Sequence, residues 1–175
     1  MAVDLSTFRR TLGQFASGIT VVTSRDAAGR PAGLTANAFC SVSLDPPLVL
    51  VCVDHRSEVS EALRDSGLFG VSVLSEGQED WSRRFASGGP EKFMDAGLLT
   101  GVHGTLLVPD ALAHLECRVR AAYPEGDHTI WVGEVLGLAV IPGRPLLYHA
   151  SAYRRLDGEG GVGETETGAH VRDRV

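Results

Sequence analysis

A run of small and hydroxylated side chains at residues 33–47 is the densest concentration of candidate chemistry in the chain. Small side chains let the backbone approach a planar ligand closely, so that its amide groups can hydrogen-bond the polar edge of that ligand. The side chains able to add to such bonds are Thr35, Asn37, Ser41 and Ser43. On residue types alone, a structural β bend lined with Ser and Thr is the simpler explanation, and both interpretations stay open.

A second candidate is His128, which follows the turn signal Gly126-Asp127 and precedes an apolar strand pattern. This position predicts an imidazole at the rim of a β sheet, where it can bond a carboxamide or a pyrophosphate oxygen. An unperturbed histidine has a pKa of about 6.5, so the group can also respond to pH. Asp127 either fixes the ring orientation or only shapes the turn, and a histidine at a turn is often a solvated surface group.

Three other patterns are weighed as chemistry and set aside. Residues 158–163 satisfy GxGxxG, but no strand pattern precedes them and no helix pattern follows, so a phosphate cradle lacks its frame. Residues 114–116 read HLE like a zinc deaminase, yet the PCxxC that completes such a site is absent, and we expect no metal. Cys40, Cys52 and Cys117 are odd in number and widely spaced, which indicates reduced, mostly buried thiols.

The elements that must position the candidate residues are mostly β strands. Runs of β-branched and apolar residues predict strands at 19–23, 33–35, 48–53, 69–74, 104–108, 112–123, 129–141 and 146–149. Helical spacing predicts helices that begin at Asp4 or Ser6, at Ser57 and at Gln78. The nearly continuous apolar run at 48–53 predicts a strand buried on both faces. This pattern favours a mainly β fold, a closed or partly open barrel, over a doubly wound parallel sheet.

Length and charge limit the class of protein. The 175 residues fit one domain, which we place at residues 1–156, and the acidic, glycine-rich residues 157–175 predict a disordered tail. A net charge of −6 argues against nucleic acid as a partner, because nucleic acid is bound by clustered Lys and Arg. No stretch nears the roughly 20 apolar residues of a membrane span, so we expect a cytoplasmic protein.

The run at residues 33–47 resembles the flavin-binding stretch of the flavin reductase-like, FMN-binding split-barrel family. Four further segments resemble that family in the same order, and the resemblance covers residues 8–156. These segments are residues 8–23, 54–57, 84–86 with 92–93, and 126–135, the last of which contains the GDH sequence associated with nicotinamide binding. The resemblance implies a Greek-key-like split β-barrel with a few helices.

The resemblance also implies an activity and its partners. Members of this kind reduce FMN or FAD by hydride transfer from NADH or NADPH, and they supply diffusible reduced flavin to a separate flavin-dependent monooxygenase. Relatives of this fold typically bind flavin along a homodimer interface, so we expect a homodimer. No residue in the sequence decides between FMN and FAD, or between NADH and NADPH.

Site residues follow from the resemblance, position by position. His128 is the catalytic candidate and also a cofactor-binding candidate, and Arg56, Ser57 and Lys92 are candidates for phosphate or adenine contacts. The other cofactor-binding candidates are Thr35, Ala36, Asn37, Ser41, Val42, Ser43, Asp54, Phe85, Ala86, Gly126, Asp127 and Tyr153. The chain departs from the family near its last strand, where glycine is common but residues 149–154 read HASAYR.

Three other interpretations compete with a reductase. A non-catalytic FMN-binding carrier of the same fold would not need the segment Gly126-Asp127-His128. A relative of pyridoxamine phosphate oxidase would need more basic residues for its substrate phosphate than Lys92 and scattered arginines provide. A purely structural barrel leaves the ordered agreement of five segments unexplained.

Overall fold

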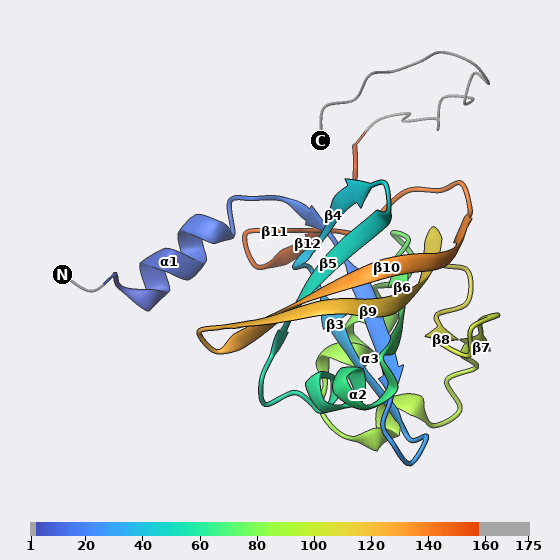
Figure 1. Cartoon of the computed structure of the whole chain (residues 1–175). Helices are drawn as coiled ribbons and strands as arrows, with labels where there is room; N and C mark the ends of the chain where they lie inside the picture. The colour runs from blue at the N-terminus through green and yellow to red at the C-terminus, as the bar shows by residue number, and fades with distance from the viewer. Residues whose placement is uncertain (1–2, 158–175) are drawn as a thin grey trace.

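A seven-stranded antiparallel sheet forms the body of the protein in the computed structural model, which describes residues 3–157 (Figure 1). Its strands are β2 (Thr20–Arg25), β3 (Pro31–Ala36), β4 (Phe39–Leu44), β5 (Pro47–Asp54), β6 (Leu68–Val73), β9 (Ala113–Glu125) and β10 (His128–Val140). They lie in the order β3-β2-β6-β9-β10-β5-β4, so β3 and β4 are the two edges. The mainly antiparallel β architecture predicted from the sequence is confirmed.

The two edge strands of this sheet are consecutive in the chain. Only Asn37 and Ala38 separate the end of β3 from the start of β4. Because two residues span only about 7–10 Å, the opposite edges must come together, and the sheet rolls into a barrel that is split between β3 and β4. On the β4 side, the carbonyl oxygen of Ala38 accepts a hydrogen bond of 3.1 Å from the amide of Cys52 in β5.

Two small sheets flank the barrel. One contains β1 (Ser17–Gly18), β11 (Leu147–His149) and β12 (Ala152–Arg154), and the other contains β7 (Leu99–Thr100) and β8 (Leu106–Leu107). In place of the strand predicted at 104–108, the structure has β8, which is only two residues long. The strand β4 lies within residues 33–47, where the sequence analysis predicted a strand only at 33–35, because Ser41 and Ser43 are not among the β-branched and aromatic residues that mark a strand.

Within residues 3–157, three α-helices and one 3₁₀ helix accompany the strands. They are α1 (Leu5–Leu12), α2 (Glu58–Ser66), α3 (Glu79–Ala86) and η1 (Pro90–Phe93). Asp4 caps α1 and Ser57 caps α2, as predicted, because their side-chain oxygens accept backbone amides of the first turn. Among the described residues, no helix has the length and apolar character that crossing a membrane requires.

Two apolar clusters make up the core. The first fills the barrel and includes Val51, Phe69 and Trp131, with Leu63 of α2 packed against them. The second contains Phe85 of α3 together with apolar residues in or next to β2, β6, β8 and β11. The backbone of the barrel is therefore fixed from inside, and its strands present their alternate side chains outward.

The prediction that the run at residues 48–53 is buried on both faces is wrong for the isolated chain. Val49, Val51 and Val53 are buried in the barrel, whereas the alternating Leu48, Leu50 and Cys52 are only half-buried. We call the apolar surface formed by Leu50 and Cys52 with their neighbours on β4 the outer β4–β5 face. The sequence pattern thus correctly reports a second apolar face, but one chain alone does not cover it.

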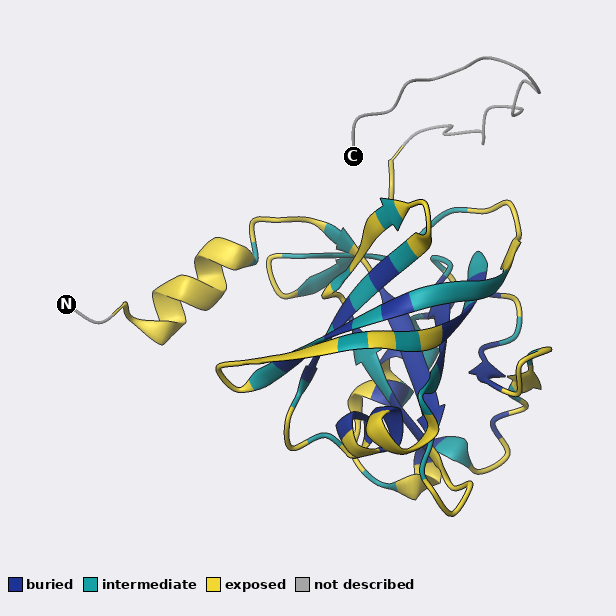
Figure 2. Cartoon of the chain, in the orientation of Figure 1, coloured by how far each residue is buried: buried dark blue, intermediate teal, exposed yellow. Residues whose placement is uncertain are grey.

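The helix α1 stands away from the barrel, and Figure 2 shows it exposed along its whole length. None of its residues is buried. Leu5, Phe8 and Leu12 repeat at helical spacing, and their exposed fractions are 71%, 51% and 57%. The predicted apolar spacing is present, but the surface that it should pack against is missing from the single chain.

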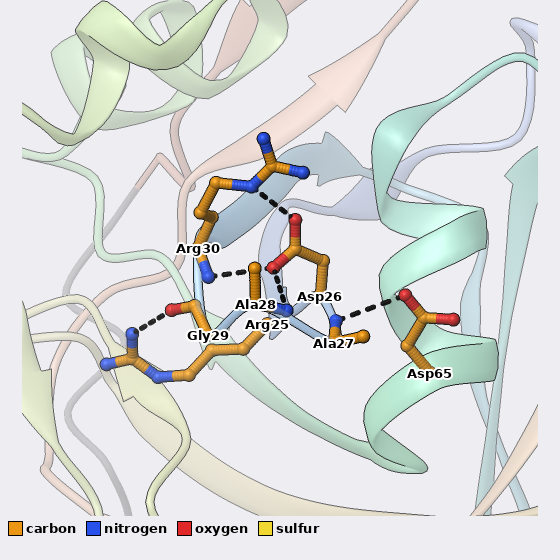
Figure 3. A network of polar contacts seen from close by, with 7 residues as sticks. All are labelled: Arg25, Asp26, Ala27, Ala28, Gly29, Arg30 and Asp65. Atoms are coloured by element: carbon orange, nitrogen blue, oxygen red, sulfur yellow. Dashed lines mark hydrogen bonds and ion pairs between the residues drawn. The ribbon is translucent and has the colours of Figure 1, made fainter.

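A network of hydrogen bonds closes the hairpin between β2 and β3 (Figure 3). The carboxylate of Asp26 accepts the amides of Ala28 and Arg30 at 2.9 and 2.8 Å, and it pairs with the Arg30 guanidinium at 2.6 Å. The amide of Ala27 donates to Asp65 of α2 at 3.1 Å, which ties the turn to that helix. The hairpin therefore holds β3 in register at the edge that borders the split.

The three cysteines differ in burial. All are free thiols, and only Cys117 is buried, whereas Cys52 is half-buried and Cys40 is exposed. Burial raises the pKa of Cys117 to about 12, so its thiol is protonated and inert. The prediction of reduced thiols fits these positions, but the prediction that most of them are buried is wrong, because β4 turns Cys40 toward the outer β4–β5 face.

The predicted tail lies almost wholly outside the described residues, and so does the GxGxxG match at 158–163. Asp157 is the only residue of the predicted tail that the structure describes. The boundary that we place after Leu156 stays a prediction.

The turn between β11 and β12, at Ala150 and Ser151, has a backbone conformation that suits the glycine common there in the family. Ala150 and Ser151 both have positive φ angles, 50° and 62°, which is a left-handed conformation that side chains disfavour. The Ala150 amide also donates to the carbonyl of Gly13 at 2.8 Å, so this turn anchors the end of the segment that carries α1.

Replacing Ala150 with glycine should raise the free energy of unfolding by about 1 kcal/mol, because glycine adopts positive φ without steric strain. Thermal or urea unfolding measures this change. Ala152→Gly, in the extended backbone of β12, is the matched control and should destabilise instead. Equal destabilisation by both changes would show that the turn is not strained.

A buried carboxylate fixes the loop between β7 and β8. Glu116 of β9 accepts hydrogen bonds from the amides of Val102 and His103 and from the hydroxyl of Thr105, at 2.9, 2.8 and 2.8 Å. Burial alone would raise the pKa of this carboxyl, but the three hydrogen bonds outweigh it and lower the pKa below its ordinary value of 4.5. The ionised carboxylate therefore stabilises the folded state.

The variant Glu116→Gln should lose on the order of 1–3 kcal/mol of stability at neutral pH, because the amide places two donors against the three donors of the loop. A depressed carboxyl pKa stabilises the fold above pH 4.5, and that contribution disappears as the pH falls through the folded pKa. The difference between variant and wild type should therefore shrink in acid. Urea unfolding across pH checks this, and Glu125→Gln on the exposed hairpin should show neither effect.

Candidate functional site

Two cavities meet where the barrel is split. An inner cavity of about 230 Å³ lies between β3, α3 and the β11–β12 hairpin. An outer groove of about 860 Å³ lies between α1 and the outer β4–β5 face. Asn37 and Tyr148 line both, so the two spaces adjoin at the connection between the edge strands. The larger volume is within the range of small-molecule sites, roughly 300–1,000 Å³.

Polar contacts fix the walls of the inner cavity. The Thr35 hydroxyl donates to the Ser82 carbonyl at 2.6 Å, which joins β3 to α3. The hydroxyls of Ser82 and Tyr153 lie 2.9 Å apart, and the rings of Tyr148 and Tyr153 meet edge to face at 5.6 Å. Ala86, one turn beyond Ser82, leaves room at the end of the helix. The cavity therefore offers a small polar floor beside two aromatic rings.

The outer groove has a mostly apolar lining and His128 at its rim. Phe8 and Leu12 of α1 line one side, and Leu50 and Cys52 of β5 line the other. Burial raises the pKa of the Cys52 thiol, so this sulfur is a neutral part of the wall. Such a groove can hold a flat, largely apolar ring system while leaving it an exit to solvent.

A tight turn aims His128 at this groove. The turn between β9 and β10 contains only Gly126 and Asp127, and the positive φ of 59° at Gly126 is one that glycine adopts without strain. The Asp127 carboxylate lies 2.7 Å from Nδ1 of His128, and this hydrogen bond lowers the pKa of Asp127. Because the ionised carboxylate only accepts, Nδ1 carries the proton and Nε2 remains available to a ligand.

An ion pair sits beside this histidine. Asp54 is the cross-strand neighbour of His128, and its carboxylate binds Arg56 through Nε at 3.2 Å and Nη2 at 2.8 Å. These hydrogen bonds hold the pKa of Asp54 well below its usual range. The rim therefore carries two carboxylates, Asp54 and Asp127, and one guanidinium that is already paired.

The three residues predicted for phosphate or adenine contacts all have partners within the fold. Arg56 pairs with Asp54, and the Ser57 hydroxyl caps α2 by accepting the amide of Val59 at 3.3 Å. Lys92 is buried, with its ammonium 2.8 Å from Glu58. None of the three lines either cavity among the described residues. Their binding roles stay predictions. To bind a phosphate or an adenine, each side chain would have to share its present partner with the ligand or give that partner up.

The remaining predicted residues border the split from its walls. Ser41, Val42 and Ser43 lie on β4, where a bulge interrupts the pairing with β5. Because β4 is an edge strand, every second amide of this segment points away from the sheet and can donate to a ligand. Ala36 ends β3, and Phe85 is buried with its ring packed against Gly33 and Phe93. These residues shape the site more than they line it.

Sequence reasoning missed two residues of the inner cavity, Ser82 and Tyr148. Ser82 could have been found, because it precedes the predicted Phe85 and Ala86 by three and four positions and so shares their helix face. Tyr148 lies directly opposite Tyr153 in the β11–β12 hairpin. No spacing in the sequence pairs them, since both strands are only three residues long.

The residues around the split fit a flavin. Small side chains and outward amides suit a planar ring with a polar edge, and the tyrosine rings and apolar groove wall suit its faces. The residues of the inner cavity that would hold such a ring are Thr35, Asn37, Ser82, Ala86, Tyr148 and Tyr153. His128 lines the outer groove, and its contact with a nicotinamide-bearing ligand stays a prediction. In residues 3–157 no cluster of three metal-ligating side chains occurs.

A rolled sheet with this split and these lining residues defines the flavin reductase-like class. The family model described as flavin reductase like domain matches residues 12–157, and the chain belongs to this family. The resemblance stated from the sequence is confirmed, and so is the split-barrel fold.

Similar proteins agree with this assignment. An NADH-dependent flavin reductase of a Rhodococcus species is 42% identical over 151 residues, 85% of each chain. The reductase subunit of a flavin-dependent monooxygenase from Mycobacterium tuberculosis is 38% identical over 175 residues, covering 98% of this chain and 90% of the relative. A solved NADH:FAD oxidoreductase of Streptomyces globisporus, in complex with NAD and FAD fragments, superimposes with a TM-score of 0.84 at 39% identity, covering 91% of this chain and 99% of that one.

Filling the inner cavity should weaken flavin binding without unfolding the protein. Ala86→Leu extends an exposed side chain of α3 into this space, so the KM for added flavin should rise at least tenfold while the melting temperature changes little. Steady-state NADH oxidation at varied flavin measures this. Ala27→Leu in the exposed β2–β3 turn is the matched control and should leave the KM unchanged. An unchanged KM for Ala86→Leu would exclude the inner cavity as the flavin site.

Proposed function

We propose that this protein is an NADH-dependent flavin reductase that works at the split between β3 and β4. It oxidises the reduced nicotinamide nucleotide, reduces FMN or FAD, and releases reduced flavin to a separate flavin-dependent monooxygenase. The observation that carries the proposal is the junction of the two cavities at Asn37, with His128 on the rim of the outer groove. The reductase names of the similar proteins support it.

The protein's share of this chemistry is positioning. Bound flavin supplies the acceptor for the hydride of the nicotinamide, so no side chain has to transfer a proton in that step. The inner cavity and the β4 amides hold one ring, and the rim holds the other at contact distance, which is what hydride transfer requires. His128, fixed through Nδ1 by Asp127, presents Nε2 as the acceptor for a carboxamide N–H.

The choice of NADH rests on the relatives and on the charges of the rim. Two of the similar proteins named above, the Rhodococcus reductase and the Streptomyces globisporus oxidoreductase, act with NADH by their names. In this chain, Arg56 is paired with Asp54, and Asp127 adds a further negative charge. The guanidinium of Arg56 is thus already neutralised at this rim, which disfavours a second phosphate there, so NADH is the proposed donor.

We further propose a homodimer that acts in the cytoplasm. The half-exposed outer β4–β5 face supports the dimer, because an apolar face of this kind is normally covered. The three free thiols and the nicotinamide cofactor support a reducing compartment. The open outer groove suits a flavin that must leave the site, and residues 1–156 are proposed as the catalytic domain.

The alternative is a non-catalytic flavin carrier of the same fold. A carrier needs the inner cavity and the β4 amides, but it has no use for an imidazole whose tautomer is fixed at the rim of the groove. The two functions predict different behaviour towards a reduced nicotinamide nucleotide, and one assay separates them.

Purified protein should oxidise NADH rapidly only when FMN or FAD is added, as followed by nicotinamide absorbance. His128→Ala should raise the KM for NADH by a factor of about 2–10, the value of one hydrogen bond, with a smaller effect on kcat. His103→Ala, an exposed histidine in the β7–β8 loop, is the matched control. Tight flavin binding without NADH oxidation would instead identify a carrier.

A further inference from the structure

Tyr153 lines the inner cavity from a strand that holds it with few backbone contacts. Its strand β12 has three residues and lies at the edge of a small sheet, where it pairs with the three residues of β11. Strands in globular proteins usually have five or six residues, so this ladder is short. The position of the Tyr153 ring therefore depends on the contacts that its side chain makes.

The helix α3 provides two of these contacts from adjacent positions. The Tyr153 hydroxyl lies 2.9 Å from the hydroxyl of Ser82, and the guanidinium carbon of Arg83 lies 4.9 Å from the centre of the Tyr153 ring. A cation is attracted to an aromatic face within about 6 Å of the ring centre. Arg83 is not among the described residues that line the inner cavity, so it covers a part of the ring that the cavity leaves free.

Glu79 fixes the guanidinium of Arg83 over this ring. Arg83 donates from Nε and from Nη2 to the same carboxylate oxygen of Glu79, at 2.9 and 2.5 Å. The two residues are four positions apart and therefore lie one turn apart on the same side of α3. An exposed ion pair of this kind contributes little to stability by itself. Its effect here is to hold a long, flexible side chain in the geometry that covers Tyr153.

The adjacent arginine has different partners. Arg84 donates from Nε to the carbonyl oxygen of Lys92 at 2.7 Å and from Nη2 to that of Met94, so it anchors the backbone that follows α3. Arg83 and Arg84 are therefore not interchangeable charges on a solvated helix face. One holds a loop, and the other covers a tyrosine of the inner cavity.

We propose that Arg83 is a positioning residue of the flavin site: anchored by Glu79, it holds the Tyr153 ring in place as a wall of the inner cavity. This inference rests on the proposed function and adds to it a residue that contacts neither ligand. A wall that is fixed before flavin binds lowers the entropic cost of binding, so loss of Arg83 should weaken binding of flavin.

The effect should be confined to flavin. Neither Arg83 nor Tyr153 is among the described residues that line the outer groove, where His128 lies. Loss of Arg83 should therefore leave the KM for NADH unchanged. A general loosening of the fold would instead raise the KM values for both ligands, so this difference separates a positioning role from a merely structural one.

The experiment compares Arg83→Ala with Arg64→Ala, which removes the same charge from the last turn of α2. Arg64 also lies over an aromatic ring, that of Trp131 at 5.9 Å, and it is not among the described residues that line either cavity. Arg83→Lys keeps the cation, and Arg83→Ala is also made together with Tyr153→Leu. Quenching of FMN fluorescence gives the Kd without NADH, NADH oxidation gives both KM values, and thermal unfolding confirms that each variant is folded.

Arg83→Ala should raise the Kd and the KM for FMN about two- to fivefold, the range of one exposed cation–π contact, and Arg83→Lys should recover part of this loss. Arg64→Ala should change neither value. In the protein that carries Tyr153→Leu, Arg83→Ala should have no further effect, because the ring that it positions is gone.

An unchanged Kd for Arg83→Ala would overturn the positioning role. So would an equal rise of the Kd with and without the Tyr153 ring, because Arg83 would then act through some other contact. Wild type that binds FMN but never oxidises NADH would overturn the reductase activity alone, since the Kd values would still test the role of Arg83.

Discussion

The connection of β3 to β4 by two residues is the constraint on which the rest of the structure depends. Strand pairing places these two strands at opposite edges of a seven-stranded sheet, and Asn37 with Ala38 brings the edges together. The sheet can satisfy both conditions only by rolling up with a gap. The site is therefore a consequence of topology, since edge-strand amides, a helix end and an aromatic hairpin meet at the gap.

The elements that border the gap are fixed by contacts with the rest of the fold. Thr35 is tied to α3 by its hydroxyl, Phe85 locks that helix into the core against Gly33, and Tyr153 is tied to Ser82. The side chains that line the gap can stay rigid, because their hydrogen bonds are already made within the fold. This arrangement suits a reaction whose chief requirement is that two rings be held at a fixed distance.

The sequence predicted the elements well where local patterns determine them. The caps at Asp4 and Ser57 and the long strands β9 and β10 follow from short-range chemistry, and the structure has them. Tyr148 was missed because its role comes from pairing across a three-residue hairpin, which no periodicity reports. The partners of Lys92 and Arg56 were missed for the same reason, since an ion pair depends on which elements the fold brings together.

Two predictions of burial from apolar patterns were wrong for the single chain, and they are the most informative ones. The run at residues 48–53 has apolar side chains on both faces, and α1 has a full apolar stripe, so the sequence specifies burial in both places. The single chain buries only the inner face of β5 and nothing of α1. Hydrophobic patterning reports the surfaces that are covered in the functional assembly, whichever chain covers them. When such a pattern exceeds what one barrel can bury, as it does here at both walls of one groove, the excess marks apolar surface that the described chain alone leaves uncovered.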